Sequence, residues 1–487
     1  MLHRIFKFLP ILVLLTITLS SCHEAGYYID AEHGDDSHSG TSPWNAWKSV
    51  DKVNTHTFEP GDNIFFKRGT SYDRGVQVNG DGIAEAPIWI RSYGKGEATS
   101  FTNTNDDDLN GNCIQLNGDY QILEDMYCHS TNPSPARGFL NVWKLGGIKV
   151  NRGADHCIIR NNEVEDCPIG INSYGEHTLI TQNNVHDCNR PIWFPYWGPI
   201  GIRLGMGNQE ASWNEIRNYH SMGGEWGGDG GAFEIDDGRY PRNNIYLHHN
   251  KTSECMGFCE ISYNFDICAR DTVDCLTENR IYDNIIIAYN ESADYRTFTQ
   301  FWAPLSNSFI ENNTIYRKWE HPDIESNVFC ENDEDKLAME YPTTYRNNLV
   351  VVVEAQTRKV THNEEGLGNR IYLGYPLAPV NQDHNLYFNR DSSRHFFSPD
   401  EEESIALQAG SFIADPLLLD LGLGEYHLTS SSPAIDQGNQ GGHYEMDLDG
   451  NPIVGKRDIG AYEFQGTSGV VYRLMPKQTR NLAVRGD

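Results

Sequence analysis

Short stretches in which apolar and polar residues alternate recur along the chain, for example at residues 156–160 and 244–248. An alternation with a period of two predicts β-strands that bury one face. Each stretch adjoins a phrase of the form Asn-x-(Val/Ile/Thr). The phrases begin at Asn162, Asn183, Asn214, Asn250, Asn284, Asn313 and Asn348, so they recur at intervals of 21 to 36 residues.

The uneven spacing decides between repeat architectures. Propeller blades need a regular period and four antiparallel strands per unit, and leucine-rich repeats need a leucine consensus that this chain lacks. A solenoid of parallel strands with loops of variable length fits best. Asparagine suits its corners, because it tolerates the left-handed backbone conformation and its stacked side chains can form hydrogen bonds along a ladder.

Composition narrows the class of protein further. The 487 residues contain 38 Lys plus Arg against 68 Asp plus Glu, a formal charge of −30, and no basic run offsets it. This charge argues against nucleic acid as a partner. The 38% of hydrophobic residues can form a large core, and 45 glycines favour turns over helices.

Both ends of the predicted solenoid carry motifs of a known group. Residues 27–30, 34–36, 40–44, 47–50 and 60–66 form the N-terminal set, and residues 432–438, 447–450 and 458–463 form the C-terminal set. The chain thereby resembles the right-handed parallel β-helix proteins among secreted bacterial carbohydrate-active enzymes. The resemblance implies an all-β, single-stranded right-handed parallel β-helix with long inter-coil loops. We assign residues 1–21 to a signal peptide, 22–465 to the β-helix domain with its N-terminal cap and 466–487 to a C-terminal tail.

The first 22 residues indicate export. Arg4 and Lys7 precede an apolar stretch at residues 8–19, which suits a signal peptide. Residues 19–22 (LSSC) resemble the lipobox of bacterial lipoproteins, which implies lipidation of Cys22. We therefore expect a monomeric lipoprotein in the periplasm or at the cell surface, anchored to the outer membrane by this lipid alone. The alternative is an ordinary cleaved signal peptide in which Cys22 is incidental.

The ten cysteines after Cys22 show no CxxC spacing, so zinc and redox sites find little support. Cys167, Cys188 and Cys255 occupy equivalent positions in their coils, which predicts a buried stack of small side chains. Cys268 and Cys275 could close a short loop.

Alignment of the strand that follows each phrase predicts a column of side chains on the outer wall. The apolar residues expected to point inward are Ile148, Ile171, Ile202, Phe233 and Cys259. Alternation then sends Lys149, Asn172, Arg203, Glu234 and Glu260 outward. A second column on the same face contains Asn151, Tyr174, Gly205, Asp236 and Ser262. Because coils stack about 4.8 Å apart, Glu234, Asp236 and Glu260 should converge on one patch beside Arg203.

Paired carboxyl groups are the usual machinery of glycosidic cleavage, about 5–5.5 Å apart in retaining enzymes and roughly 6.5–9.5 Å apart in inverting ones. Stacking Glu234 on Glu260 should raise the proton affinity of one of them and leave it a competent acid. Residues 234–236 (EID) also resemble the Glu-x-Asp strand of iota-carrageenases, which implies that Glu234 is an acid and Asp236 a base. The alternative is that these acidic residues only solvate the surface or bind a structural cation.

The loops next to this patch are rich in aromatic residues, on which sugar rings commonly pack. Predicted substrate contacts, besides Lys149, Asn172 and Arg203, are Trp193, Tyr196, Trp197, Trp226, Asp229, Asp237 and Trp302. The aromatic residues could instead belong to the core, and Asp229 and Asp237 could be turn residues. His220, His248 and His249 lack HxH or HExxH spacing, so we assign no metal ligand.

Three functions remain open. A glycoside hydrolase would use Glu234 or Glu260 as the acid, and Asp236 or the other glutamate as base or nucleophile. A polysaccharide lyase or epimerase would hold calcium with its acidic residues and abstract a proton with Lys or Arg. A non-enzymatic glycan-binding protein would need only the aromatic residues. The carboxylates favour a hydrolase acting on a neutral or lightly charged sugar, with no cofactor required and calcium possible.

Overall fold

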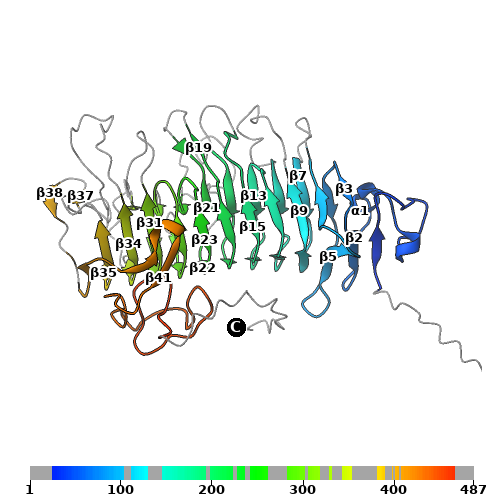
Figure 1. Ribbon diagram of the computed structural model, residues 1–487. Helices are drawn as coiled ribbons and strands as arrows, with labels where there is room; N and C mark the ends of the chain where they lie inside the picture. The colour runs from blue at the N-terminus through cyan, green and yellow to red at the C-terminus, as the bar shows by residue number, and fades with distance from the viewer. Residues whose placement is uncertain are drawn as a thin grey trace, which may run out of the picture.

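The computed structural model describes residues 25–103, 111–129, 145–192, 198–222, 228–235, 242–261, 282–301, 305–318, 328–331, 343–353, 381–389, 397–398, 401–404, 407 and 409–466. Three parallel sheets run along an elongated solenoid, which confirms the predicted parallel β-helix (Figure 1). In each coil the chain passes from sheet 1 to sheet 3 and then to sheet 2, as β11, β12 and β13 do.

Each sheet is a stack of parallel strands, one from each successive coil. Sheet 1 consists of β1 (Tyr27–Ile29), β2 (Asn63–Lys67), β5 (Ile88–Tyr93), β8 (Gln121–Glu124), β11 (Ile158–Arg160), β14 (Leu179–Thr181), β17 (Gln209–Ser212), β22 (Ile245–His248), β26 (Ile285–Ala288), β30 (Phe309–Glu311), β33 (Thr344–Arg346) and β35 (Asn381–Asp383). Sheet 2 consists of β4 (Val76–Val78), β7 (Gly111–Leu116), β10 (Leu145–Val150), β13 (Ile169–Ser173), β16 (Ile200–Leu204), β21 (Gly231–Ile235), β24 (Cys259–Ile261), β28 (Thr299–Phe301) and β32 (Phe329–Glu331). Sheet 3 consists of β3 (Ser71–Tyr72), β6 (Thr99–Phe101), β9 (Met126–His129), β12 (Glu163–Glu165), β15 (Asn184–His186), β18 (Glu215–Arg217), β23 (Lys251–Ser253), β27 (Glu291–Ala293), β31 (Thr314–Lys318), β34 (Leu349–Val353), β36 (Leu386–Asn389) and β39 (Phe412–Ile413).

Smaller elements lie outside these sheets. They are η1 (Pro43–Asn45), α1 (Val50–Asn54), η2 (Leu421–Leu423) and the strand pairs β19 (Ser221–Met222) with β20 (Gly228–Asp229), β25 (Tyr282–Asp283) with β29 (Leu305–Ser306), β37 (Phe397–Ser398) with β38 (Glu401–Ser404), and β40 (Leu418–Asp420) with β41 (Glu425–Leu428). No helix in the described residues is long and apolar enough to cross a membrane.

A ladder of buried asparagines stabilises the bend between sheets 1 and 3. Asn250 is fully buried. Its Oδ1 accepts one hydrogen bond from the backbone N–H of Asn214 at 2.9 Å and a second from the side-chain Nδ2 of Asn214 at 3.0 Å. The ladder contains Asn162, Asn183, Asn214, Asn250, Asn290, Asn313, Asn348 and Asn385. Each rung therefore satisfies the polar groups of the coil beside it.

Asn284 was expected in this ladder, but it is not one of its rungs. Asn284 lies at the preceding corner, directly before the sheet 1 strand β26, where its Nδ2 donates to Asn244 Oδ1 at 2.8 Å, and Asn290 occupies the rung. The phrase at residues 284–286 misled because Asn284 directly precedes the apolar strand β26. The left-handed conformation also belongs mainly to the residue before each rung, such as Asn161 (φ 54°) and His249 (φ 55°).

The core inside the three sheets contains buried Ile, Val, Leu, Phe and cysteine side chains. Cys167, Cys188 and Cys255 are all buried, as predicted, and burial raises the pKa of the Cys188 and Cys255 thiols well above the ordinary value. Cys268 and Cys275 lie outside the described residues.

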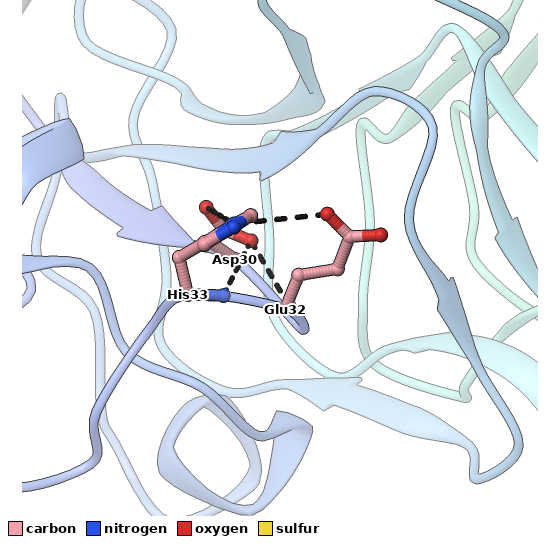
Figure 2. A group of neighbouring side chains, drawn as sticks. All are labelled: Asp30, Glu32 and His33. Carbon is pink, nitrogen blue, oxygen red and sulfur yellow. Dashed lines mark hydrogen bonds and ion pairs between the residues drawn. The ribbon is translucent and has the colours of Figure 1, made fainter.

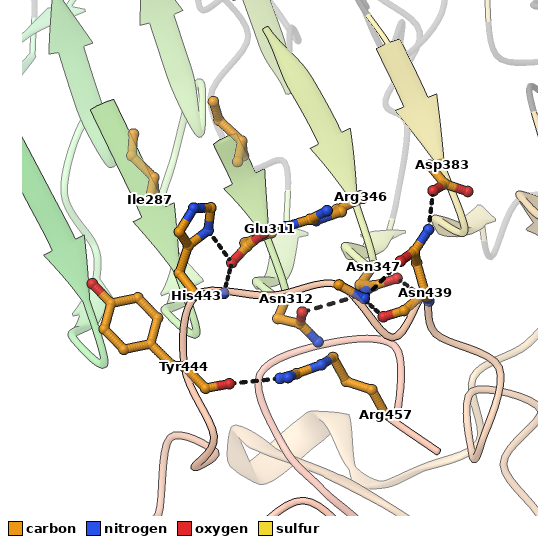
Figure 3. A network of polar contacts seen from close by, with 12 residues as sticks. Ile287, Glu311, Asn312, Arg346, Asn347, Asp383, Asn439, His443, Tyr444 and Arg457 are labelled. Carbon is orange, nitrogen blue, oxygen red and sulfur yellow. Dashed lines mark hydrogen bonds and ion pairs between the residues drawn. The ribbon is translucent and has the colours of Figure 1, made fainter. Parts of the chain in front are cut away.

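Residues 414–466, here called the closing segment, follow the last strand of sheet 3 and pack against the outside of the last coils (Figure 3). The carboxylate of Glu311 on β30 is fully buried and accepts hydrogen bonds from His443 N–H at 2.8 Å and from Arg346 Nε at 2.7 Å. Asn347 Oδ1 accepts from Asn439 N–H at 2.7 Å, and Arg457 donates to the hydroxyl of Tyr289 on the solenoid. Buried polar contacts therefore join the closing segment to the solenoid.

Candidate functional site

Strand pairing in sheet 2 confirms the register of the predicted column. Lys149 pairs with Asn172, Asn172 with Arg203, Arg203 with Glu234, and Glu234 with Glu260. The predicted inward residues Ile148, Ile171, Ile202, Phe233 and Cys259 are all buried in the core. The two glutamates are therefore neighbours on adjacent strands, whose spacing is about 4.8 Å.

The members of the column differ in exposure. Glu234, Glu260 and Lys149 are half-buried, whereas Asn172 and Arg203 are fully buried. We had expected Asn172 and Arg203 to contact substrate. Their complete burial fits support of the neighbouring carboxylates better, because neither side chain forms part of the surface.

Two of the contacts that hold Arg203 come from the preceding coil. Its guanidinium donates to Asn172 Oδ1 at 3.2 Å and lies 5.0 Å from the centre of the Tyr174 ring. Tyr174 belongs to the predicted second column, and a Cβ on Gly205 would lie only 2.7 Å from its Cδ1. Gly205 thus leaves room for the aromatic ring that contacts Arg203.

A buried thiol and two glycines lie on the strands that carry the glutamate pair or directly before them. The pKa of the Cys259 thiol is raised first by its burial and then by the charges of Glu260 and Glu234, so both carboxylates act on the same point. Gly231 and Gly257 precede the two glutamates by three residues, and a Cβ on Gly257 would lie 2.9 Å from the carbonyl oxygen of Thr297. Glycine at these two positions therefore lets the backbones of neighbouring coils pack closely near the start of the strands that carry the glutamates.

Two glutamines extend the column: Gln115, which was not predicted, and Gln300, which was expected only as a possible extension of the cleft and not as a substrate contact. Gln115 on β7 pairs with Lys149, and Gln300 on β28 pairs with Glu260. The Thr297 hydroxyl donates to Gln300 Oε1 at 3.5 Å. The same alternation, continued by one coil in each direction, would have found both glutamines.

Asp229 lies near the start of the strand that carries Glu234. Its Oδ2 accepts a hydrogen bond from the backbone N–H of Gly198 at 3.0 Å. Burial raises its pKa, which the charge of Arg296 partly offsets. These contacts agree with the turn role that was the alternative to substrate binding. Asp236, Asp237, Ser262, Trp193, Tyr196, Trp197, Trp226 and Trp302 lie outside the described residues, as does Cys22.

One group of side chains in the described residues has the spacing of a metal site, namely Asp30, Glu32 and His33 in the N-terminal cap (Figure 2). Lys67 Nζ lies 2.7 Å from Asp30 Oδ2 and 3.2 Å from His33 Nδ1. Burial opposes ionisation of Asp30, but Lys67 and two backbone N–H groups bring its pKa below the ordinary value. An ammonium group thus already neutralises this carboxylate.

His220, His248 and His249 all contact neighbouring side chains of the protein. His249 is buried, its ring stacks on Trp213 at 4.4 Å, and burial lowers its pKa to about 3. His248 Nε2 lies 3.1 Å from Glu210 Oε1. His220 Nε2 lies 3.0 Å from Asn218 Oδ1, and burial lowers its pKa.

Comparison with known proteins gives local and distant similarities. No protein-family model matches the chain. A lacto-N-biosidase from Bifidobacterium longum subsp. longum is 39% identical over 72 residues, which is 14% of this chain and 4% of that protein's length.

Two solved structures resemble the fold at low sequence identity. A pectate lyase, Pel9A, is 14% identical with a TM-score of 0.48 and covers 90% of this chain and 97% of its own. The structure of XylC in complex with xylose is 9% identical with a TM-score of 0.49, and the match covers 90% of this chain and 98% of XylC. The fold of this chain is established by its own strand pairing.

Proposed function

We propose that the protein is an extracellular carbohydrate-active enzyme, a glycoside hydrolase that cleaves a poly- or oligosaccharide with paired carboxylates. The observation that carries the proposal is the in-register pairing of Glu234 with Glu260 on the outer wall of sheet 2. One glutamate donates a proton to the departing oxygen, and the other acts on the sugar or on water. Asp236, two positions after Glu234, is a further carboxylate proposed for this chemistry.

The surroundings of the pair support this chemistry. Both glutamates are half-buried, so they have surface for a substrate but are partly shielded from water. Two like charges on adjacent strands favour the state in which the pair holds one proton. The local similarity to a lacto-N-biosidase, an enzyme named for acting on a glycoside, points the same way.

A polysaccharide lyase is the second candidate, because Lys149 and Arg203 lie in the same column as the carboxylates. A lyase would leave an unsaturated sugar that absorbs ultraviolet light, whereas a hydrolase releases reducing ends without that absorbance. Calcium would be the cofactor of the lyase, so chelation should abolish its activity and leave the hydrolase active. The proposed hydrolase requires no calcium.

The experiment combines a panel of neutral polysaccharides and chromogenic glycosides, including a lacto-N-bioside, with point variants. Glu234→Gln and Glu260→Gln should each lower kcat by roughly 10²–10⁴-fold. Glu215→Gln changes an exposed glutamate on β18 and serves as the matched control. Full activity in both site variants would refute the proposed machinery. Binding of a glycan without any product would identify a glycan-binding protein instead.

We also propose that the protein is an exported lipoprotein attached to the outer membrane through Cys22. The support is the apolar stretch and LSSC sequence at residues 8–22. Incorporation of a labelled fatty acid into the wild-type protein, and its loss in Cys22→Ser, would test the assignment.

A further inference from the structure

The two glutamates of the pair have different neighbours, and this difference assigns their roles. Arg203 is one strand from Glu234 and two strands from Glu260. On its other side Glu260 pairs with Gln300, which carries no charge. Among the described strands of sheet 2, the paired neighbour of Glu234 outside the glutamate pair is therefore a fixed cation, and that of Glu260 is a neutral amide.

Arg203 is fully buried, and contacts from the preceding coil help to hold it in place. Asn172, itself fully buried, accepts its hydrogen bond at 3.2 Å, and the Tyr174 ring lies 5.0 Å from the guanidinium carbon. Guanidinium groups stay protonated in proteins, so the charge is permanent. Coulomb attraction at one strand spacing is about twice that at two spacings, and burial limits screening by salt.

The other titratable groups near Glu234 do not reverse this asymmetry. Among the described residues, the strands packed against Glu234 contribute Arg203 on β16, and Cys259 and Glu260 on β24. Burial raises the pKa of the Cys259 thiol well above its ordinary value, so it is neutral near pH 7. Lys149, three strands from Glu234 along the same column, adds positive charge on the Arg203 side.

We propose that Arg203 is a positioning residue that keeps Glu234 ionised, so that Glu260 holds the proton of the pair and acts as the general acid. The assignment rests on the proposed hydrolase function. As the C1–O bond breaks, the proton of Glu260 moves to the departing oxygen. Over the full cycle, water supplies the hydroxyl group to C1 and returns one proton to the pair.

Ionisation can be measured directly and without a substrate. In protein labelled with ¹³C at glutamate Cδ, Glu234→Gln and Glu260→Gln identify the two signals. Glu234 should ionise at a lower pH than Glu260. Arg203→Met should raise the Glu234 midpoint by about one pH unit, whereas Arg203→Lys should keep the order. Arg160→Met, which removes a partly buried arginine from the Glu124 carboxylate on sheet 1, is the matched control and should change neither midpoint.

Kinetics gives an independent readout with the best glycoside from the panel. Arg203→Met should lower kcat by 10-fold or more with little change in KM, and should move the acidic limb of the pH profile upward. Glu260→Gln should retain more activity on a dinitrophenyl glycoside, whose leaving group needs no acid, than on a glycoside with a poor leaving group. Glu234→Gln should lose activity on both.

The outcomes separate this inference from the proposed function. A protein that cleaves no glycoside refutes the hydrolase, while the NMR order still decides the role of Arg203. If Glu260 ionises first, or if the Glu234 midpoint is unchanged in folded Arg203→Met, the inference is wrong. If Arg203→Met does not fold, as judged by its thermal unfolding, the order in the wild type and in Arg203→Lys decides.

Discussion

Glu463 in the closing segment is a buried acid whose ionisation should weaken the folded state. Its side chain is 4% exposed, Oε1 accepts the Asp458 N–H at 2.9 Å, and Oε2 is buried without a hydrogen-bond partner. Burial first, and then the nearby carboxylates of Asp458 and Asp447, raise the pKa of Glu463 from 4.5 to about 8. Arg457 offsets only part of this effect.

The sign of the pH dependence follows from proton binding. Between pH 4.5 and about 8 the folded protein holds the Glu463 proton and the unfolded chain has lost it, so stability falls as the pH rises through this window. Each pH unit in the window is worth about 1.4 kcal/mol, which gives an upper limit of about 5 kcal/mol. Because the pKa of Asp458 is also raised, to about 6, the two acids titrate together. We therefore expect a loss of roughly 2–5 kcal/mol from these acids.

Glu463→Gln removes the ionisable group and keeps the shape of the side chain. The variant should match the wild type within about 1 kcal/mol at pH 5 and exceed it by about 2–4 kcal/mol at pH 9. Denaturant unfolding at pH 5, 7 and 9 measures the difference. Glu445→Gln, at a side chain that is 86% exposed in the same segment, should show no such crossover. A Glu463→Gln protein that is less stable than the wild type at pH 9 would refute the argument.

Three further predictions concern other parts of the chain. Asn250→Ala should cost about 3–5 kcal/mol in chemical denaturation, because it leaves buried donors on Asn214 without an acceptor, whereas Asn161→Gly at an exposed corner should change stability by less than about 1 kcal/mol. Lys67→Met should lower the midpoint of thermal unfolding at pH 7, because it leaves the buried Asp30 carboxylate without its cation. Calcium should not change the midpoint of the wild type, and a calcium-dependent rise would show that a metal can displace Lys67. Cys22→Ser should move the protein from the detergent phase to the aqueous phase in detergent partitioning, and an unchanged distribution would contradict a lipid anchor at Cys22.

The strand register of sheet 2 was predictable because side-chain alternation fixes which residues face outward, whatever the length of the loop between coils. The same logic failed at Asn284, where a corner asparagine before an apolar strand imitates a ladder rung. Burial of Arg203 and Asn172 was not predictable, because strand alternation gives the direction of a side chain and not what covers it. The contact of Glu311 with His443 joins residues 132 positions apart, and no local pattern encodes it.

The column also shows how this architecture separates chemistry from specificity. Successive members from Lys149 to Glu260 are 23, 31, 31 and 26 residues apart, yet all pair in register. Insertions between coils can therefore vary without moving the carboxylates, because the strands and the asparagine ladder set the register. If the carboxylates catalyse the reaction, exchanging an inter-coil loop next to β21 should alter which glycoside is cleaved while the pH profile stays unchanged. A loop exchange that shifts the pH profile would show that the loops supply charged groups to the reaction itself.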